Sequence, residues 1–130
     1  MPIIAAMRKP LVLLVVALAA VLAAAAPASP QNRELIAKVG LHDAYRISLT
    51  LPNGRPVRSI PAGTYVFVVH DYSKLHNFAL GSVTQNRRIF TGGIAFVGTR
   101  TYRVKLTPGS YAYACSAHPT TMHGAFTVTP

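Results

Sequence analysis

The sequence predicts an all-β protein, a Greek-key β-sandwich of about seven or eight strands that follows an amino-terminal signal peptide. Three observations support this fold class. Apolar residues recur at every second position in most segments after residue 33. Turn signals rich in Pro and Gly separate these segments, and none of them has the 3.6-residue period of an amphipathic helix.

Residues 1–28 are expected to form a secretory signal peptide. Arg8 and Lys9 precede an uninterrupted apolar run over residues 11–26, and small residues around Ala28 provide a cleavage site. The apolar run has 16 residues, which is shorter than the roughly 20 of a membrane-spanning helix. An uncleaved membrane anchor is the alternative. Either reading predicts a periplasmic or secreted protein of the cell envelope.

The remaining chain is expected to form a short linker over residues 29–33 and one domain over residues 34–130, with no room for a second core. Of 13 Lys and Arg, Arg8 and Lys9 precede the cleavage site, so 11 remain against three acidic residues, a formal charge of +8. Such a charge favours acidic protein partners or an anionic membrane surface. Nucleic acid is not expected, because no basic run has interleaved aromatic residues. We expect a monomer.

Eight segments have the alternation or the β-branched and aromatic content of strands. They are expected at residues 34–39, 46–51, 64–69, 76–80, 87–90, 101–106, 111–115 and 124–129. Pro108-Gly109 predicts a hairpin between the sixth and seventh segments. Together they predict an antiparallel sandwich.

Cys115 is the only cysteine of the chain. Small exported domains usually depend on paired cysteines, and here no intramolecular disulfide is possible. An unpaired thiol in an oxidising compartment is a liability unless it is buried or held by a metal. An inert core thiol is therefore one interpretation, and a metal ligand is the other.

The loop after the predicted strand 111–115 favours the metal ligand. Cys115, His118 and Met122 offer a thiolate, an imidazole and a thioether, and two imidazoles with a thiolate and a weak axial Met form a copper site for electron transfer. The second imidazole is expected from His76. Side-chain alternation points Cys115 inward with Tyr111, and it points Met122 inward while His123 points away.

Three segments resemble the cupredoxins, the small blue copper proteins: His76-Asn77-Phe78, Cys115-Ser116-Ala117-His118 and Met122-His123-Gly124. The resemblance covers residues 34–130. It implies one copper ion held by His76, Cys115, His118 and Met122. It also implies that Asn77 braces the two ligand-bearing segments and lies near the thiolate. Fewer residues separate His118 from Met122 than in plastocyanin-like loops and more than in amicyanin, so we expect an altered axial distance, colour and potential.

The resemblance implies a type 1 copper protein that transfers electrons to or from an acidic redox partner and is not an enzyme. A copper-delivery protein of the cell envelope and a metal-free interaction sandwich are the alternatives. Zinc is a rival metal, although a thioether ligand and the affinity order favour copper. Catalysis by a Cys-His pair would need an oxyanion hole that no motif supplies. His42, His70 and His123 are expected to be surface or turn residues, and His123 adjoins the loop closely enough to compete with Met122 for metal.

Overall fold

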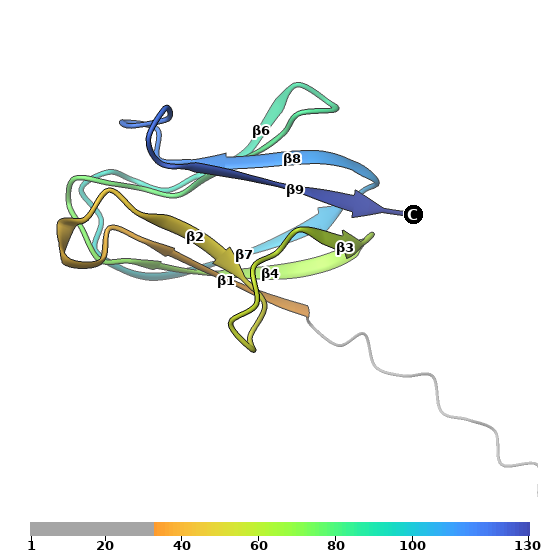
Figure 1. Cartoon of the computed structure of the whole chain (residues 1–130), viewed down its shortest axis with the longest axis horizontal. Helices are drawn as coiled ribbons and strands as arrows, with labels where there is room; N and C mark the ends of the chain where they lie inside the picture. Colours follow the sequence, from red (N-terminus) through yellow and green to blue (C-terminus); the bar gives the residue numbers. More distant parts are fainter. Residues whose placement is uncertain (1–32) are drawn as a thin grey trace, which may run out of the picture.

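The computed structural model describes residues 33–130 and shows a two-layer β-sandwich (Figure 1). These residues contain nine strands and one short 3₁₀ helix, η1, at Leu41–Asp43. The expected signal peptide, and the linker up to residue 32, lie outside the described residues. Within the described part of the chain, no helix has the length and apolar character needed to cross a membrane.

The nine strands divide into a sheet of four and a sheet of five. The first sheet has the spatial order β2 (Ile47–Thr50), β1 (Arg33–Val39), β4 (Gly63–Asp71) and β7 (Gly98–Leu106). The second sheet has the order β3 (Ser59–Pro61), β9 (His123–Thr129), β8 (Gly109–Ala114), β5 (Ala79–Ser82) and β6 (Arg87–Thr91).

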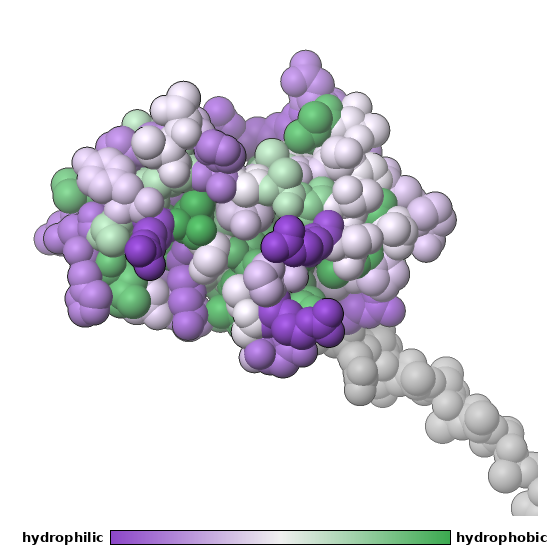
Figure 2. Space-filling view, viewed as in Figure 1, coloured by the Kyte–Doolittle hydropathy of each residue, from purple (hydrophilic) through white to green (hydrophobic). Residues whose placement is uncertain are grey.

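The hydrophobic core lies between the two sheets, as the alternation predicts. On β1 the side chains of Leu35, Ala37 and Val39 are buried and that of Lys38 is exposed, and on β9 Phe126 and Val128 are buried. On the face of the molecule shown in Figure 2, hydrophobic residues are scattered among hydrophilic ones. The predicted sandwich is therefore confirmed.

Four details differ from the prediction. The three-residue strand β3 was not predicted, and the strand expected to start at His76 starts at Ala79. The sheets are not purely antiparallel, because β1 pairs with β4 and β3 with β9 in parallel. The predicted hairpin at Pro108-Gly109 is wrong, since β7 and β8 belong to different sheets.

The chain crosses between the sheets at a corner fixed by a tyrosine. The hydroxyl of Tyr111 donates to the carbonyl of Thr107 at 2.7 Å and accepts the N–H of the same residue at 3.1 Å. Gly109 has φ 149°, and a side chain there would lie 2.8 Å from Thr84 Oγ1. Both features favour a sharp change of direction over a flat hairpin.

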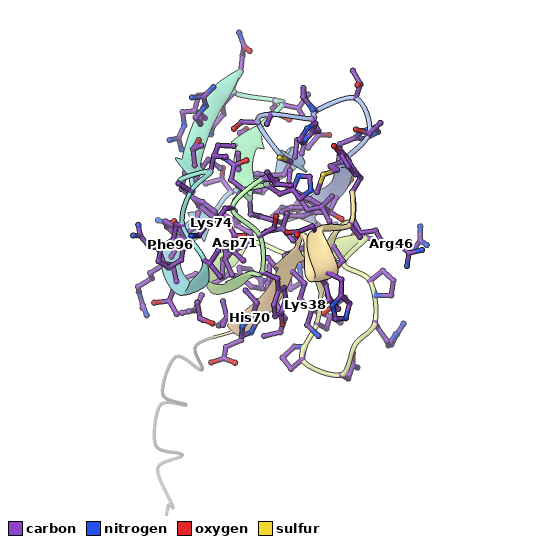
Figure 3. All side chains as sticks on the ribbon, turned by 90° about the vertical axis from the view of Figure 1, so that its left-hand side faces the viewer. Lys38, Arg46, His70, Asp71, Lys74 and Phe96 are labelled. Carbon is purple, nitrogen blue, oxygen red and sulfur yellow. The ribbon has the colours of Figure 1, made fainter. Side chains whose placement is uncertain are left out.

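Three connections meet at one end of the sandwich. They are the turn between β1 and β2, the loop between β4 and β5, and the loop between β8 and β9. The first two are in contact, because a side chain placed on Gly40 would lie 3.0 Å from His76. Figure 3 faces this end and shows Lys38, Arg46 and Lys74 around it.

Candidate metal centre

The loop between β4 and β5 places His76 through two short side-chain turns. Asp71 Oδ1 accepts the N–H of Ser73 at 3.0 Å, and Ser73 Oγ accepts the N–H of Leu75 at 3.0 Å. Asp71 and Ser73 are buried. Burial raises the pKa of the Asp71 carboxyl, while the Ser73 N–H and the nearby His76 act in the opposite direction. This ordered loop delivers the fully buried ring of His76 to the end of the core.

Gly40 allows the turn after β1 to approach this loop. Its φ of +69° favours glycine, and a Cβ at this position would lie 2.6 Å from the Ser73 Cβ atom. A larger residue at this position would displace the loop between β4 and β5, and His76 would move with it.

The loop between β8 and β9 is closed by backbone hydrogen bonds. The N–H of Cys115 donates to the carbonyl of Met122 at 3.0 Å, and the N–H of Met122 donates to the carbonyl of His118 at 2.9 Å. Cys115 directly follows β8 and Met122 directly precedes β9. Because β8 and β9 are paired antiparallel neighbours, both side chains enter the core at the same end.

Three of the predicted ligands lie together. His76 Nδ1 and His118 Nδ1 are 3.1 Å apart, and Cys115 Sγ lies 3.9 Å from the first and 3.7 Å from the second. Within residues 33–130 these three side chains form a group that could hold a metal ion. Cys115 and His76 are fully buried and His118 is half-buried.

The triangle of donor atoms fits one metal ion. Metal–nitrogen bonds of about 2.0 Å and metal–sulfur bonds of about 2.3 Å, as zinc makes, separate trigonal ligands by about 3.5 Å between nitrogens and about 3.7 Å between nitrogen and sulfur. The observed separations of 3.1, 3.7 and 3.9 Å lie close to these values. Two imidazoles and one thiolate are also the donor set of trigonal copper sites.

The turn between β1 and β2 selects the tautomer of His76. Its Nε2 lies 3.2 Å from the carbonyl oxygen of Asp43, which can only accept, so we assign the ring proton to Nε2. The Nδ1 atom then keeps its lone pair and faces Cys115 and His118. Such a hydrogen bond on the outer nitrogen orients an imidazole for metal binding.

Asn77 connects the two ligand-bearing loops. Its backbone N–H lies 3.4 Å from Cys115 Sγ, and its side chain accepts the N–H of Ser116 at 2.7 Å. The side-chain amide donates to Ser116 Oγ at 2.8 Å and to the carbonyl of Gly92 at 2.7 Å. Asn77 is buried. These bonds connect the loop of His76 with the loop of Cys115, and the role of Asn77 beside a bound metal stays a prediction.

The sequence also predicts Met122 as an axial ligand and the three remaining histidines as surface or turn residues. Met122 is buried at the same end and packs in the core, and its role as an axial ligand stays a prediction. His42 lies in η1, His70 Nδ1 lies 3.0 Å from Thr99 Oγ1, and His123 is exposed. None of these three belongs to the metal-binding group found in residues 33–130.

Tyr45 is a site residue that sequence reasoning missed. Its ring meets the ring of His76 edge-on with centroids 4.9 Å apart, and the ring of His118 with centroids 4.7 Å apart. Its side chain is nevertheless 59% exposed. The turn that carries Tyr45 has left-handed conformations at His42 (φ 55°) and Asp43 (φ 57°), which are costly for residues other than glycine. No pattern in the sequence indicates this contact.

The two-layer sandwich has the cupredoxin fold, and it carries a His-Cys-His group at one end. The solved structures similar to this chain include the copper protein rusticyanin (TM-score 0.54, 20% identity), covering 74% of this chain and 76% of that one. Reduced rusticyanin gives a TM-score of 0.56 at 20% identity, with the same coverage. Rusticyanin from Thiobacillus ferrooxidans gives a TM-score of 0.51 at 19% identity, and the coverage of both chains is the same.

These likenesses establish the fold. No protein-family model matches the chain, and no curated protein matches it.

Proposed function

We propose that this protein is an exported type 1 copper protein that carries single electrons and converts no substrate itself. The observation that carries the proposal is the triangle formed by His76 Nδ1, His118 Nδ1 and Cys115 Sγ, with sides of 3.1, 3.7 and 3.9 Å. Rusticyanin, a copper protein of the same fold, supports copper as the metal. Copper would supply the one-electron chemistry by cycling between its two oxidation states.

Contacts within the chain hold the proposed ligands in place. The Asp43 carbonyl holds the proton of His76 on Nε2, and Asn77 holds the loop that bears Cys115. His118 Nδ1 lies 3.1 Å from His76 Nδ1. For both Nδ1 atoms to bind one metal ion, the ring proton of His118 would have to be on its Nε2 atom. Ligands held in place in this way favour rapid electron exchange.

His118 is the proposed point of electron exchange, because it is half-buried while His76 is fully buried. Leu41, Tyr45 and Leu75 are large hydrophobic residues that remain about half exposed and come from the two loops that meet at this end. Lys38, Arg46 and Lys74 lie around the same end (Figure 3). This combination favours a weak, transient contact with an acidic redox partner, steered by charge. We propose that the protein acts as a monomer.

The proposal is tested by adding copper(II) to the purified protein and recording its visible and electron paramagnetic resonance spectra. We expect an intense visible band from the thiolate and reversible oxidation and reduction without loss of metal. A protein without this band would instead be a metal-free sandwich. A protein that gains the band but loses copper during each redox cycle would favour copper delivery.

Met122→Leu is expected to keep the colour and to raise the reduction potential. A weak axial donor still stabilises the more highly charged copper(II) relative to a site with no donor there, and the axial ligand tunes the potential of such sites. Leucine donates no electrons, so copper(II) loses more than copper(I). Leucine has a similar volume, so the fold should lose less than about 1.5 kcal/mol. Voltammetry measures the potential, and an unchanged potential would show that the Met122 sulfur does not reach the metal.

Tyr45→Ala is expected to accelerate the removal of copper by a chelator about tenfold. Each of the two ring contacts contributes about 0.5–1.5 kcal/mol, and about 1.4 kcal/mol corresponds to a factor of ten. Tyr45→Phe is the matched control, because it keeps the ring and should exchange copper at the original rate. Equal rates for the alanine variant and the original protein would mean that the ring does not protect the site.

A further inference from the structure

Strand β6 forms an open edge of the second sheet, and β7 forms an open edge of the first. The two edges face each other across the sandwich, because the rings of Phe90 and Tyr102 are stacked with centroids 4.0 Å apart and planes 2° apart. A cavity of about 560 Å³ lies between them and has a half-buried apolar floor. An edge strand leaves one row of backbone N–H and C=O groups without a strand partner.

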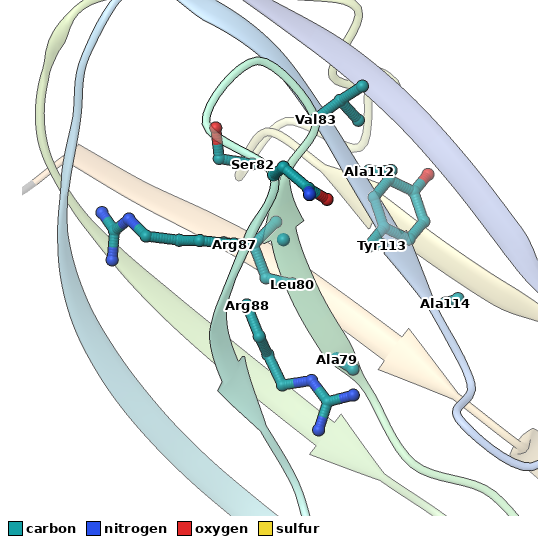
Figure 4. Close-up of a pocket in the computed structure, with 11 residues that line it drawn as sticks. Ala79, Leu80, Ser82, Val83, Arg87, Arg88, Ala112, Tyr113 and Ala114 are labelled. Atoms are coloured by element: carbon teal, nitrogen blue, oxygen red, sulfur yellow. The ribbon is translucent and has the colours of Figure 1, made fainter.

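Two adjacent arginines of β6 point to opposite faces of its sheet. Arg87 pairs with the buried Ser82, whereas Arg88 pairs with Gly81. Arg87 lines the cavity beside β7, and both arginines line a second cavity of about 450 Å³ over β5 and β8. Figure 4 shows their side chains leaving the strand in different directions. Small residues, including Ala79 and Ala112, also line the second cavity.

The cavity between the edges is rimmed by positive charge. Arg103 and Lys105 of β7 line it together with Arg87. Among the described residues that line this cavity and the one over β5 and β8, none is acidic. An acidic ligand would therefore complement the charges of Arg87 and Arg88.

We propose that β6 binds an extended acidic segment of a partner protein as an added strand. The free edge supplies the backbone hydrogen bonds of strand addition. Because side chains alternate along a strand, two consecutive acidic residues would meet Arg87 on one face and Arg88 on the other. The apolar floor formed by Phe90 and Tyr102 would accept a neighbouring apolar side chain.

Charge and backbone chemistry select this occupant. A second copy of the chain would bring another basic edge, and like charges on facing strands repel. A nucleic acid carries the required charge but has no backbone amides to pair with the edge. The inference does not rest on copper, because each contact it uses is formed by the polypeptide alone.

The test is a nuclear magnetic resonance titration of the ¹⁵N-labelled protein, without metal and again with copper(I). The probe is an eight-residue peptide of Val and Thr with Glu-Glu at its centre, and the matched peptide has Lys-Lys instead. We expect the acidic peptide, but not the Lys-Lys peptide, to change the chemical shifts of the backbone amides of residues 87–91. It should also slow the hydrogen exchange of these amides. The double variant Arg87→Glu and Arg88→Glu should weaken its binding by at least about tenfold.

The control variant is Arg55→Glu with Arg58→Glu, which changes the net charge equally at two exposed residues between β2 and β3. Equal weakening in both double variants would show unspecific attraction and would overturn the proposal. Amide shifts without slowed exchange would exclude strand addition, and displacement of the peptide by a single-stranded oligonucleotide would indicate a general polyanion surface. Thermal unfolding establishes that both variants are folded.

Discussion

Cys115→Ala is expected to remove the visible colour of the copper-loaded protein altogether. The thiolate is the only sulfur donor with a strong bond in the proposed site, and the intense band depends on charge transfer from it. Copper affinity should fall by more than roughly 100-fold, since loss of a hydrogen-bond partner of a metal ligand already costs about 10–100-fold. Copper titrations followed by absorbance and by a competing chelator measure both effects.

Two further variants isolate the role of the thiolate. Cys115→Ser retains a small polar side chain beside the Asn77 N–H, and it should be folded and colourless. His123→Ala changes an exposed histidine outside the metal-binding group, and it should keep the full band. An intense band in Cys115→Ala, or its loss in His123→Ala, would contradict the proposed ligand set.

Asn77→Ala is expected to lower the free energy of unfolding of the metal-free protein by about 3 kcal/mol. The variant loses three side-chain hydrogen bonds of 2.7, 2.7 and 2.8 Å, each of which contributes roughly 1 kcal/mol. A loss of this size lowers the melting temperature by roughly 12–24 °C in a domain of about 100 residues. Urea and thermal denaturation measure the two quantities.

Asn53→Ala is the matched control for this prediction. Asn53 is exposed, and its Oδ1 atom accepts the N–H of Arg55 at 3.0 Å in a turn. We expect a loss below about 1 kcal/mol, because water replaces an exposed partner. Equal losses at both positions would mean that Asn77 does not brace the two loops. The backbone N–H of Asn77 survives the substitution, so its contact with Cys115 can persist.

The strands that were predictable are those with a local signal. Alternation along β1 and β9 reports which side chains face the core, so the inward orientation of Met122 with Phe126 and the outward orientation of His123 follow from parity alone. The three residues of β3 are too few to show a period and include Pro61. Parallel pairing of β1 with β4 depends on which segments meet in space, and no local pattern encodes it.

A local turn signal also has more than one structural outcome. Pro108-Gly109 is compatible with a hairpin and with a corner, and the hydrogen bonds of Tyr111 with Thr107 decide between them. In the candidate site, residue type indicated the His and Cys donors. The carbonyls of Asp43 and Gly92 act through backbone atoms that every residue has, so residue type cannot indicate them. Tyr45 reaches the site only because its turn takes left-handed conformations at His42 and Asp43.

The direction of β1 gives the molecule two distinct poles. The strand begins at Arg33 and ends at Val39, next to the turn that contacts His76, and seven extended residues span about 20 Å. The polypeptide before β1 therefore joins the domain at the pole remote from the His-Cys-His group (Figure 1). If the residues before β1 anchored the protein to a membrane, the His-Cys-His group would lie at the end of the domain farther from the anchor.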